Sequence, residues 1–176
     1  DYLAGETKKI IAVIPGIGSA SDIAKLDQDI LFKLKRRLEN ELISIGICLG
    51  MHLFCSKLEE ADCAGLGIFN FKVERLKENS VYKSNIGYRE VKLGTLGCNN
   101  VYFCHGFGIN AIYKDLNKDE IISYKNAVSQ NESYAAMIKK KNIIGLQFHP
   151  EKSGNIGLEF IKELINERID TSNRML

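Results

Sequence analysis

Two short stretches of this sequence hold residues that could together perform nucleophilic catalysis. The first is Gly46-Ile47-Cys48-Leu49-Gly50-Met51, in which a cysteine stands between two glycines just after the apolar run 42–47. The second is Gln147-Phe148-His149-Pro150-Glu151, which ends another apolar run. A thiol, an imidazole and a carboxylate are the nucleophile, the base and the group that orients the base in thioester chemistry.

The first stretch predicts a strand that turns sharply into a helix. Small residues beside a strained nucleophile allow neighbouring backbone to pass close to it. In the second stretch, residues 143–148 predict a buried strand, and Pro150 favours an extended backbone at His149. If that backbone stays extended, the side chains of His149 and Glu151 point to the same side.

The chemistry explains why these residue types belong together. A cysteine thiol with its ordinary pKa of about 8.5 is mostly protonated at neutral pH, so it needs a base to attack a carbonyl. His149 is the candidate base, Glu151 can hold its ring, and the amide of Leu49 can donate to an oxyanion. Taken singly, a buried cysteine is usually a core residue and a lone histidine is usually structural. The two stretches together favour catalysis.

Further motifs make the pattern specific. They are Pro15-Gly16-Ile17-Gly18, Gly65-Leu66-Gly67, YFCHGF at 102–107 and QFHPEKSG at 147–154. With these motifs the chain resembles the class I glutamine amidotransferases, which use a Cys-His-Glu triad. Within that class it looks most like the glutaminase subunit of imidazole glycerol phosphate synthase, and the resemblance extends from about residue 8 to about residue 165.

The resemblance implies a fold and a reaction. The fold is a flavodoxin-like α/β architecture, an open and mostly parallel sheet flanked by helices with an antiparallel β insertion, in a single domain over residues 1–176. Cys48 would attack the side-chain amide of glutamine, release ammonia and leave a glutamyl thioester that water hydrolyses. His149 would act as acid and base, and Glu151 would orient it. No metal or other cofactor is expected.

The resemblance also implies which residues surround the substrate. The backbone amides of Gly16, Ile17 and Leu49 match the segments that form the oxyanion hole of the family. The matching positions for glutamine binding are Gly50, His52, Glu60, His105, Gly106 and Phe107.

Two of these positions depart from the common family pattern. Where the family commonly has glutamine, this chain has His52, and where it has His-Ser-Tyr, this chain has His105-Gly106-Phe107. The imidazole of His52 either replaces the hydrogen bond of the lost amide or faces a neighbouring side chain. Gly106 lacks the hydroxyl of the family serine but keeps its backbone amide.

A third departure concerns the partner. Ile86-Gly87-Tyr88-Arg89-Glu90 stands where relatives often have Gly-Trp-Asn, in a region that tends to lie near the synthase subunit. Tyr88 and Arg89 are either an interface pair or the start of an ordinary surface strand. The synthase partner is expected to be of the cyclase type, as in histidine biosynthesis, or an enzyme that makes amino or amidino sugars for surface polysaccharides. A hydrolase of the same fold and a binding subunit without catalysis are further alternatives.

Composition sets the remaining limits. With 176 residues, 45% of them hydrophobic, the chain can bury one sizeable core. A formal charge of +2 gives no electrostatic case for nucleic acid. No apolar stretch of about 18 residues and no signal-peptide pattern stands in the sequence, so we expect a cytoplasmic protein that does not enter a membrane. Five cysteines without a CxxC spacing favour neither a disulfide framework nor a zinc site.

Hydrophobic periodicity predicts the elements that must position the two stretches. Because only residues 1–9 precede the first predicted strand, we also expect the chain to lack the strand and helix with which relatives open. The predicted elements are a buried strand at 10–14, a helical stretch with Ile23, Leu26, Ile30, Leu34, Leu38 and Leu42 on one face, a strand at 44–47, a helix from the elbow to about 57, antiparallel strands within 69–93, a strand at 101–104, a strand pair around Ala127 and 134–138, a turn at 139–141, a buried strand at 143–148, and a helix from 155 that packs Leu158, Ile161, Leu164 and Ile165 inward.

Overall fold

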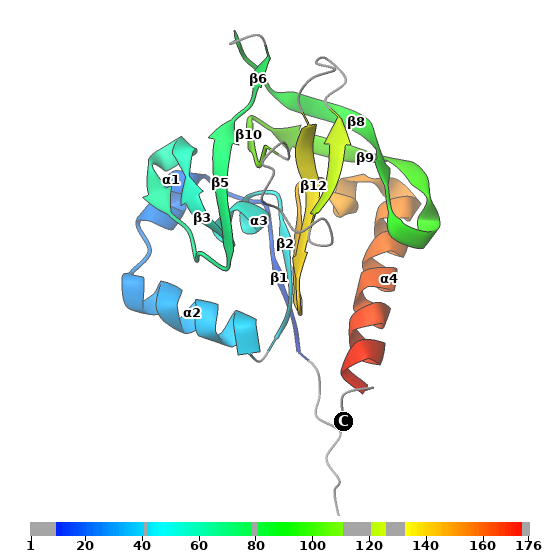
Figure 1. The fold of residues 1–176 in the computed structure, drawn as a ribbon, viewed down its shortest axis with the longest axis horizontal. Helices are drawn as coiled ribbons and strands as arrows, with labels where there is room; N and C mark the ends of the chain where they lie inside the picture. The colour runs from blue at the N-terminus through cyan, green and yellow to red at the C-terminus, as the bar shows by residue number, and fades with distance from the viewer. Residues whose placement is uncertain (1–9, 41, 79–80, 111–120, 126–132, 174–176) are drawn as a thin grey trace, which may run out of the picture.

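The computed structural model describes residues 10–40, 42–78, 81–110, 121–125 and 133–173 (Figure 1). Its centre, within these residues, is a five-stranded sheet in the order β1-β2-β13-β12-β11. The first three strands run parallel, and β12 and β11 are antiparallel to their neighbours. The strands are β1 Ile11–Ile14, β2 Ile43–Ile47, β11 Ile121–Lys125, β12 Ser133–Lys140 and β13 Ile143–Leu146.

The middle strands β2 and β13 are buried on both faces. In β13, Ile143 packs into the cluster on one face, whereas Ile144 and Leu146 pack into the cluster on the other. Figure 1 shows α2 (Gln28–Asn40) and α4 (Gly154–Asn173) on opposite sides of the sheet. Continuous apolar runs are typical of parallel strands that are covered on both faces.

The three parallel strands end at the same edge of the sheet. The last residue of β1 and the last residue of β13 each pair with a residue at the end of β2. The segments that follow these strands therefore begin side by side, and they carry Gly16, Cys48 and His149. In open α/β sheets this edge is where ligands bind.

The opposite end of β13 is anchored by Asn142. Its carbonyl accepts a hydrogen bond from the amide of Ser44 in β2, at 2.9 Å. Its side-chain amide donates to the carbonyl of Leu38, at 2.8 Å, and to that of Leu42. Asn142 thereby links the end of α2 to both central strands. The turn predicted at 139–141 lies one to two residues later, because Lys139 and Lys140 still belong to β12 and only Lys141 of the three lies in the turn to β13.

The predicted strand at 10–14 is present as β1, but the prediction that it is buried was wrong. Ile10 is 59% exposed and Val13 is 56% exposed. β1 stands at the edge of the sheet within the described residues, where a neighbour lies on one side of it. Local hydrophobicity predicts a strand but not its place in the sheet order.

The single helical face predicted between Ile23 and Leu42 is split between α1 (Ala20–Ala24) and α2. The carboxylate of Asp27 accepts hydrogen bonds from the amides of Asp29 and Ile30, at 2.8 and 3.3 Å, and so starts a new helix. The restart changes the helical phase. Ile30 is therefore exposed, as is Leu26 before the new helix, while Leu31 is buried.

The helix after the elbow is shorter than predicted. α3 spans Leu49–Leu53, and the chain then enters β3 (Cys55–Leu58). The carbonyl of Leu53 accepts from the amide of Leu66, and the carbonyl of Phe54 accepts from that of Ile68. These carbonyls are used by the following loop, so the helix cannot continue. β3 belongs to a second sheet of the order β10-β5-β3-β4.

The middle of the chain contains the predicted antiparallel strands, although β5 is parallel to β3. The hairpin of β8 (Asn85–Lys92) and β9 (Cys98–His105) crosses the molecule above the central sheet (Figure 1). Ala127 lies outside the described residues. The remaining elements are β4 Cys63–Ala64, β5 Phe69–Arg75, β6 Lys77–Glu78, β7 Val81–Tyr82, β10 Phe107–Gly108 and the 3-10 turns η1 Glu59–Ala61, η2 Gly94–Leu96 and η3 Pro150–Lys152.

The last helix, α4, packs on the sheet as predicted but with a different set of residues. Leu164 is buried and Ile161 and Ile165 are partly buried, whereas Leu158 is 57% exposed and Phe160 takes the inward position. None of the described helices is both long enough and apolar enough to span a bilayer.

Candidate active site

Cys48 occupies the sharp turn between β2 and α3 that its glycine neighbours predict. Its φ of 50° and ψ of −105° lie in a region that residues other than glycine rarely adopt. A side chain at Gly46 would come within 2.5 Å of the Gly50 carbonyl oxygen, and one at Gly50 within 2.2 Å of the Ile14 carbonyl oxygen. Only glycine fits at both positions, and the strand and helix therefore meet tightly around the cysteine.

His149 and Glu151 are joined directly. The Nδ1 atom of His149 lies 2.7 Å from a carboxylate oxygen of Glu151. Since the carboxylate only accepts hydrogen bonds, Nδ1 carries the proton, and Nε2 of the neutral ring is left as an acceptor. The pairing was predicted for a fully extended chain, but Pro150–Lys152 forms a 3-10 turn instead. The turn, and not the strand pleat, brings the carboxylate to the ring.

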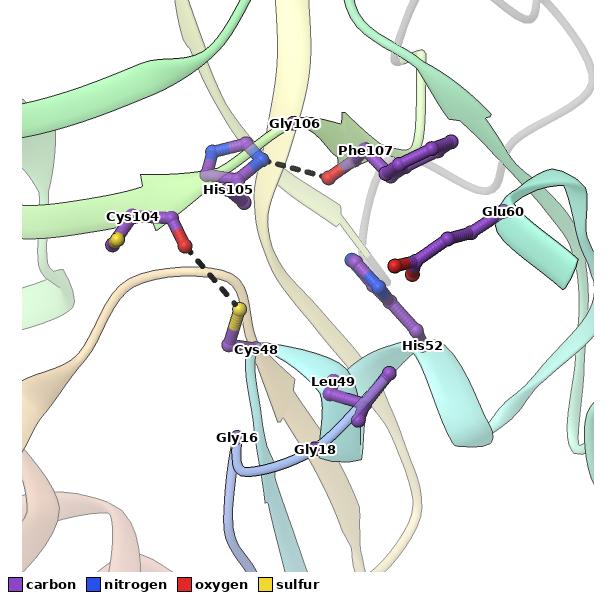
Figure 2. Close-up of a pocket in the computed structure, with 10 residues that line it drawn as sticks. All are labelled: Gly16, Gly18, Cys48, Leu49, His52, Glu60, Cys104, His105, Gly106 and Phe107. Carbon is purple, nitrogen blue, oxygen red and sulfur yellow. Dashed lines mark hydrogen bonds between the residues drawn. The ribbon is translucent and has the colours of Figure 1, made fainter. Parts of the chain in front are cut away.

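Gly16 lies where Cys48 and His149 approach each other. A β-carbon at Gly16 would stand 2.8 Å from Cβ of Cys48 and 3.3 Å from Cε1 of His149. Among the described residues, no hydrogen bond links the sulfur to the imidazole. The thiol donates instead to the carbonyl of Cys104, at 3.9 Å (Figure 2). It also accepts a hydrogen bond from the side-chain amide of Gln147, at 3.7 Å.

Burial governs the protonation of the Cys48 thiol. It raises the pKa of the Cys48 thiol to about 11, while the hydrogen bonds from the Leu49 amide and from Gln147 act in the opposite direction. At neutral pH the sulfur is therefore a thiol. A base must take its proton when it reacts.

A cavity of about 200 Å³ opens beside the sulfur (Figure 2). Most of the residues predicted around glutamine line it, together with Gly18 and Cys104, which were not predicted. Cys104 is exposed. Ile17 and Gly50 are not part of the lining: the Ile17 side chain is 83% exposed and Gly50 packs on β1. The lining comprises Gly16, Gly18, Cys48, Leu49, His52, Glu60, Cys104, His105, Gly106 and Phe107.

The ring of His52 lines the cavity and also contacts a neighbouring side chain. Its Nε2 atom lies 2.9 Å from the side-chain oxygen of Gln147. Burial lowers the pKa of His52 to about 4, so the ring is neutral near pH 7. Gln147 was not predicted as a site residue. Gln147 precedes His149 by two residues at the end of a predicted strand, where alternate side chains point to the same side, and this alternation was the available signal.

His105 holds the far wall of the cavity through its ring. Nδ1 donates to the carbonyl of Phe107 at 2.7 Å, and Nε2 lies 3.1 Å from the side-chain amide of Asn85. Burial lowers the pKa of His105 to about 3. On the other side of the cavity, the carboxylate of Glu60 points inward near His52 (Figure 2). The cavity thus offers an exposed anion opposite a fixed stretch of backbone.

Comparison with known protein families identifies the class. The model of the family described as Glutamine amidotransferase class-I matches residues 3–165. The chain belongs to this family, as its motifs suggested.

Individual relatives indicate which type of amidotransferase subunit this chain is similar to. The chain is 31% identical over 160 residues to the imidazole glycerol phosphate synthase subunit HisH of Pyrobaculum aerophilum, covering 87% of this chain and 75% of the relative. It is 31% identical over 180 residues to the HisH subunit of Bacillus cereus, covering 92% and 81%. The resemblance to this type of subunit is thereby confirmed.

Solved structures agree on the fold. A crystal structure of a glutamine amidotransferase has a TM-score of 0.61 at 19% identity and covers 86% of this chain and 77% of its own. The structure of PurLQS from Thermotoga maritima has a TM-score of 0.55 at 17% identity, with 88% and 73% covered. The predicted α/β fold class, with helices flanking a sheet that has a parallel centre, is confirmed.

Proposed function

We propose that this chain is a glutaminase subunit in which Cys48, His149 and Glu151 form the catalytic triad. The contact of 2.7 Å between His149 and Glu151, directly across Gly16 from the strained Cys48, carries the proposal. A carboxylate that fixes Nδ1–H leaves Nε2 to act as the base, which is the arrangement of a nucleophile–base–orienter triad. Similarity to the HisH subunits agrees with it.

The reaction follows from these roles. As glutamine enters, the thiol turns from the Cys104 carbonyl, its proton passes to Nε2 of His149, and the sulfur attacks the side-chain amide carbon. The tetrahedral oxyanion accepts hydrogen bonds from the amide of Leu49 and from the Gly16–Ile17 peptide. His149 then protonates the leaving nitrogen, which departs as ammonia and leaves the thioester.

The second half of the reaction uses the same base. His149 takes a proton from water, the resulting hydroxide attacks the thioester carbonyl, and the sulfur leaves. Glutamate is released and Cys48 regains its proton. Throughout, the carboxylate of Glu151 stabilises the charged imidazole and keeps its orientation.

Binding of glutamine is assigned to the two walls of the cavity. The carboxylate of Glu60 is suited to the α-amino group of the substrate, and the backbone of His105, Gly106 and Phe107 is suited to its α-carboxylate. The ring of His105 is already engaged with Phe107, at 2.7 Å, so it supports the wall and does not itself bind substrate.

The ammonia acceptor is proposed to be a synthase subunit of the cyclase type, because the relatives reported above are named as subunits of imidazole glycerol phosphate synthase. The outer face of β8 offers a docking surface beside the cavity, since Ile86 is 59% exposed and Tyr88 is 56% exposed. Tyr88 also donates to the carbonyl of Lys152 at 3.0 Å, next to Glu151. A partner seated on β8 would therefore lie near the triad.

The test is glutamate production by the purified chain alone, with an imidazole glycerol phosphate cyclase, and with an ammonia-using amino-sugar synthase. We expect the cyclase to stimulate glutamine turnover, Cys48→Ala to abolish it, and a glutamine-like electrophile to label Cys48. Full activity in Cys48→Ala would contradict the nucleophile assignment. Stimulation by the amino-sugar enzyme in place of the cyclase would contradict the partner assignment and leave the triad intact.

A further inference from the structure

A buried chain of side chains connects His52 to the nucleophile through Gln147. The amide oxygen of Gln147 lies 2.9 Å from Nε2 of His52, and its amide nitrogen donates to the sulfur of Cys48 at 3.7 Å. Gln147 is fully buried and His52 is 4% exposed. Both ends of the Gln147 amide are therefore used, one by the histidine and one by the cysteine.

The orientation of this amide is set by the histidine. A neutral imidazole that carries its proton on Nε2 can donate to the oxygen of Gln147, and this turns the NH₂ group toward the sulfur. If the amide were reversed, its oxygen would face the sulfur and would oppose a negative charge there. Burial lowers the pKa of His52 to about 4, so the ring is neutral at pH 7.

The backbone holds all three residues in place. The amide of Cys48 donates to the Leu146 carbonyl at 2.6 Å, the amide of His52 donates to the Cys48 carbonyl at 3.1 Å, and the amide of Gln147 donates to Ala136 at 2.8 Å. These backbone hydrogen bonds fix the relative positions of the three side chains. A buried hydrogen-bond network is strong when every polar atom in it has a partner.

The two hydrogen bonds of the sulfur respond differently to its protonation. The bond to the Cys104 carbonyl needs the S–H proton and is lost when the thiolate forms. The bond from Gln147 remains and becomes stronger, because its acceptor is then charged. Gln147 thus favours the reactive form of the sulfur.

We propose that Gln147 is a positioning residue that holds the sulfur of Cys48 for attack, and that His52 fixes the orientation of the Gln147 amide. The proposal rests on Cys48 being the nucleophile, as proposed above. Gln147 does not line the cavity, so it acts on the sulfur and not on glutamine. His52 contributes through Gln147.

The experiment measures carboxamidomethylation of Cys48 at pH 8 in the full chain, with the modified peptide identified by mass spectrometry. Gln147→Met fills the same space without a donor. We expect its alkylation rate to fall about 10- to 100-fold, since a hydrogen bond to a charged group corresponds to about one to two units of pKa. Merely loosening the core would expose the thiol and raise the rate.

His52 is tested by a matched pair of variants. His52→Phe keeps a ring without a donor and should also slow alkylation, whereas His52→Gln keeps a donor and should restore much of the rate. The control is Ser44→Ala, which removes another buried polar group on the strand that leads to Cys48, and whose rate should equal that of wild type. Thermal midpoints verify folding in each case.

Steady-state kinetics with the synthase complete the test. Gln147→Met should lower kcat by a similar factor and leave KM for glutamine nearly unchanged. An unchanged alkylation rate in folded Gln147→Met overturns the proposal, and if that variant does not fold, an unchanged rate in His52→Phe overturns it. Equal glutaminase activity of wild type and Cys48→Ala would instead overturn the proposed function, so the two failures are distinguishable.

Discussion

The amide of His149 donates to the carbonyl of Tyr102 at 2.8 Å, and this bond ties the proposed base to the β8–β9 hairpin. The hydroxyl of Ser153 strengthens the connection, because it accepts from the Tyr102 amide at 3.0 Å and donates to the His149 carbonyl at 2.7 Å. The hairpin also presents the exposed face of Ile86 and Tyr88. The exposed face of the hairpin is therefore connected by hydrogen bonds to the backbone of His149, the proposed base.

Replacing Ser153 with alanine should weaken this connection. Both hydrogen bonds of a buried hydroxyl are lost, so we expect unfolding free energy to fall by about 1–3 kcal/mol and kcat to fall with it as His149 shifts. Urea denaturation and glutamate release measure the two effects. Thr95→Ala removes a hydroxyl that bonds an exposed carboxylate, Glu163, and should change neither quantity appreciably. Wild-type values for Ser153→Ala would contradict the coupling.

Glu151→Gln tests the orientation of the base. The amide can offer N–H to Nδ1 of His149 and so stabilise the wrong tautomer, and we expect kcat to fall by about 10² to 10⁴ with little change in KM. The measurement is steady-state glutaminase activity with the synthase present. Glu159→Gln, an exposed change on α4, is the control. A loss of kcat of less than threefold, which corresponds to about 0.6 kcal/mol of transition-state stabilisation, would contradict the assignment of Glu151 to the triad.

Glu60→Gln should affect binding and leave the chemistry nearly intact. If the Glu60 carboxylate pairs with the substrate amine, KM for glutamine should rise about 10-fold while kcat changes little. Its neighbour Glu59 provides a close control, since Glu59 accepts from the amide of Arg75 and does not line the cavity. Equal KM values for Glu59→Gln and Glu60→Gln would refute the assignment.

Gly16→Ala should disturb both Cys48 and His149, the proposed nucleophile and base, at once. The added methyl would meet Cβ of Cys48 at 2.8 Å and the Ile47 carbonyl oxygen at 2.8 Å, and neither atom can move cheaply. We expect a loss of about 1–3 kcal/mol in stability and of most activity. Gly94→Ala is the control for backbone strain without a steric clash. The φ of Gly94 is +49°, and no atom lies within 4 Å of the new methyl group. That variant should lose about 1 kcal/mol and retain activity.

Acid should destabilise the fold through its buried histidines. Burial lowers the pKa of His52 to about 4 and that of His105 to about 3, against an ordinary value of 6.5. Below pH 6.5 the unfolded chain therefore binds protons that the folded chain does not, so stability is full above pH 6.5 and falls toward pH 4. The slope should approach about 1.4 kcal/mol per pH unit for each histidine. Urea denaturation at pH 7, 5.5 and 4.5 measures it, and His52→Phe should reduce the slope.

The proposed triad could be predicted from the sequence because each part is local. A glycine two residues before and two residues after Cys48, and an apolar run just before His149, are visible in the sequence, and the parallel sheet then brings the strand ends together. The backbone at Glu151 was predicted incorrectly, since alternation along a strand does not anticipate a 3-10 turn. The pairing was nevertheless right, because both geometries bring the carboxylate to the ring.

The contact between His52 and Gln147 was not predictable in the same way. It requires β13 to lie beside β2, which is a property of sheet order and not of either segment. The exposure of β1 likewise depends on the order of the strands in the sheet, which places β1 at an edge among the described residues. The phase change at Asp27 was missed because apolar spacing alone does not reveal where a carboxylate starts a new helix.

The anchoring of Asn142 has a consequence for the alignment of the site. A shift of β13 by one residue along its neighbours would turn every side chain to the other face of the sheet. Because both faces of β13 are apolar, burial alone does not distinguish the native register from the shifted one. The hydrogen bonds from Asn142 to the Leu38 and Leu42 carbonyls favour the native register at the start of the strand. Whether Gln147 and His149 face the sulfur is thus decided at the end of β13 farthest from it.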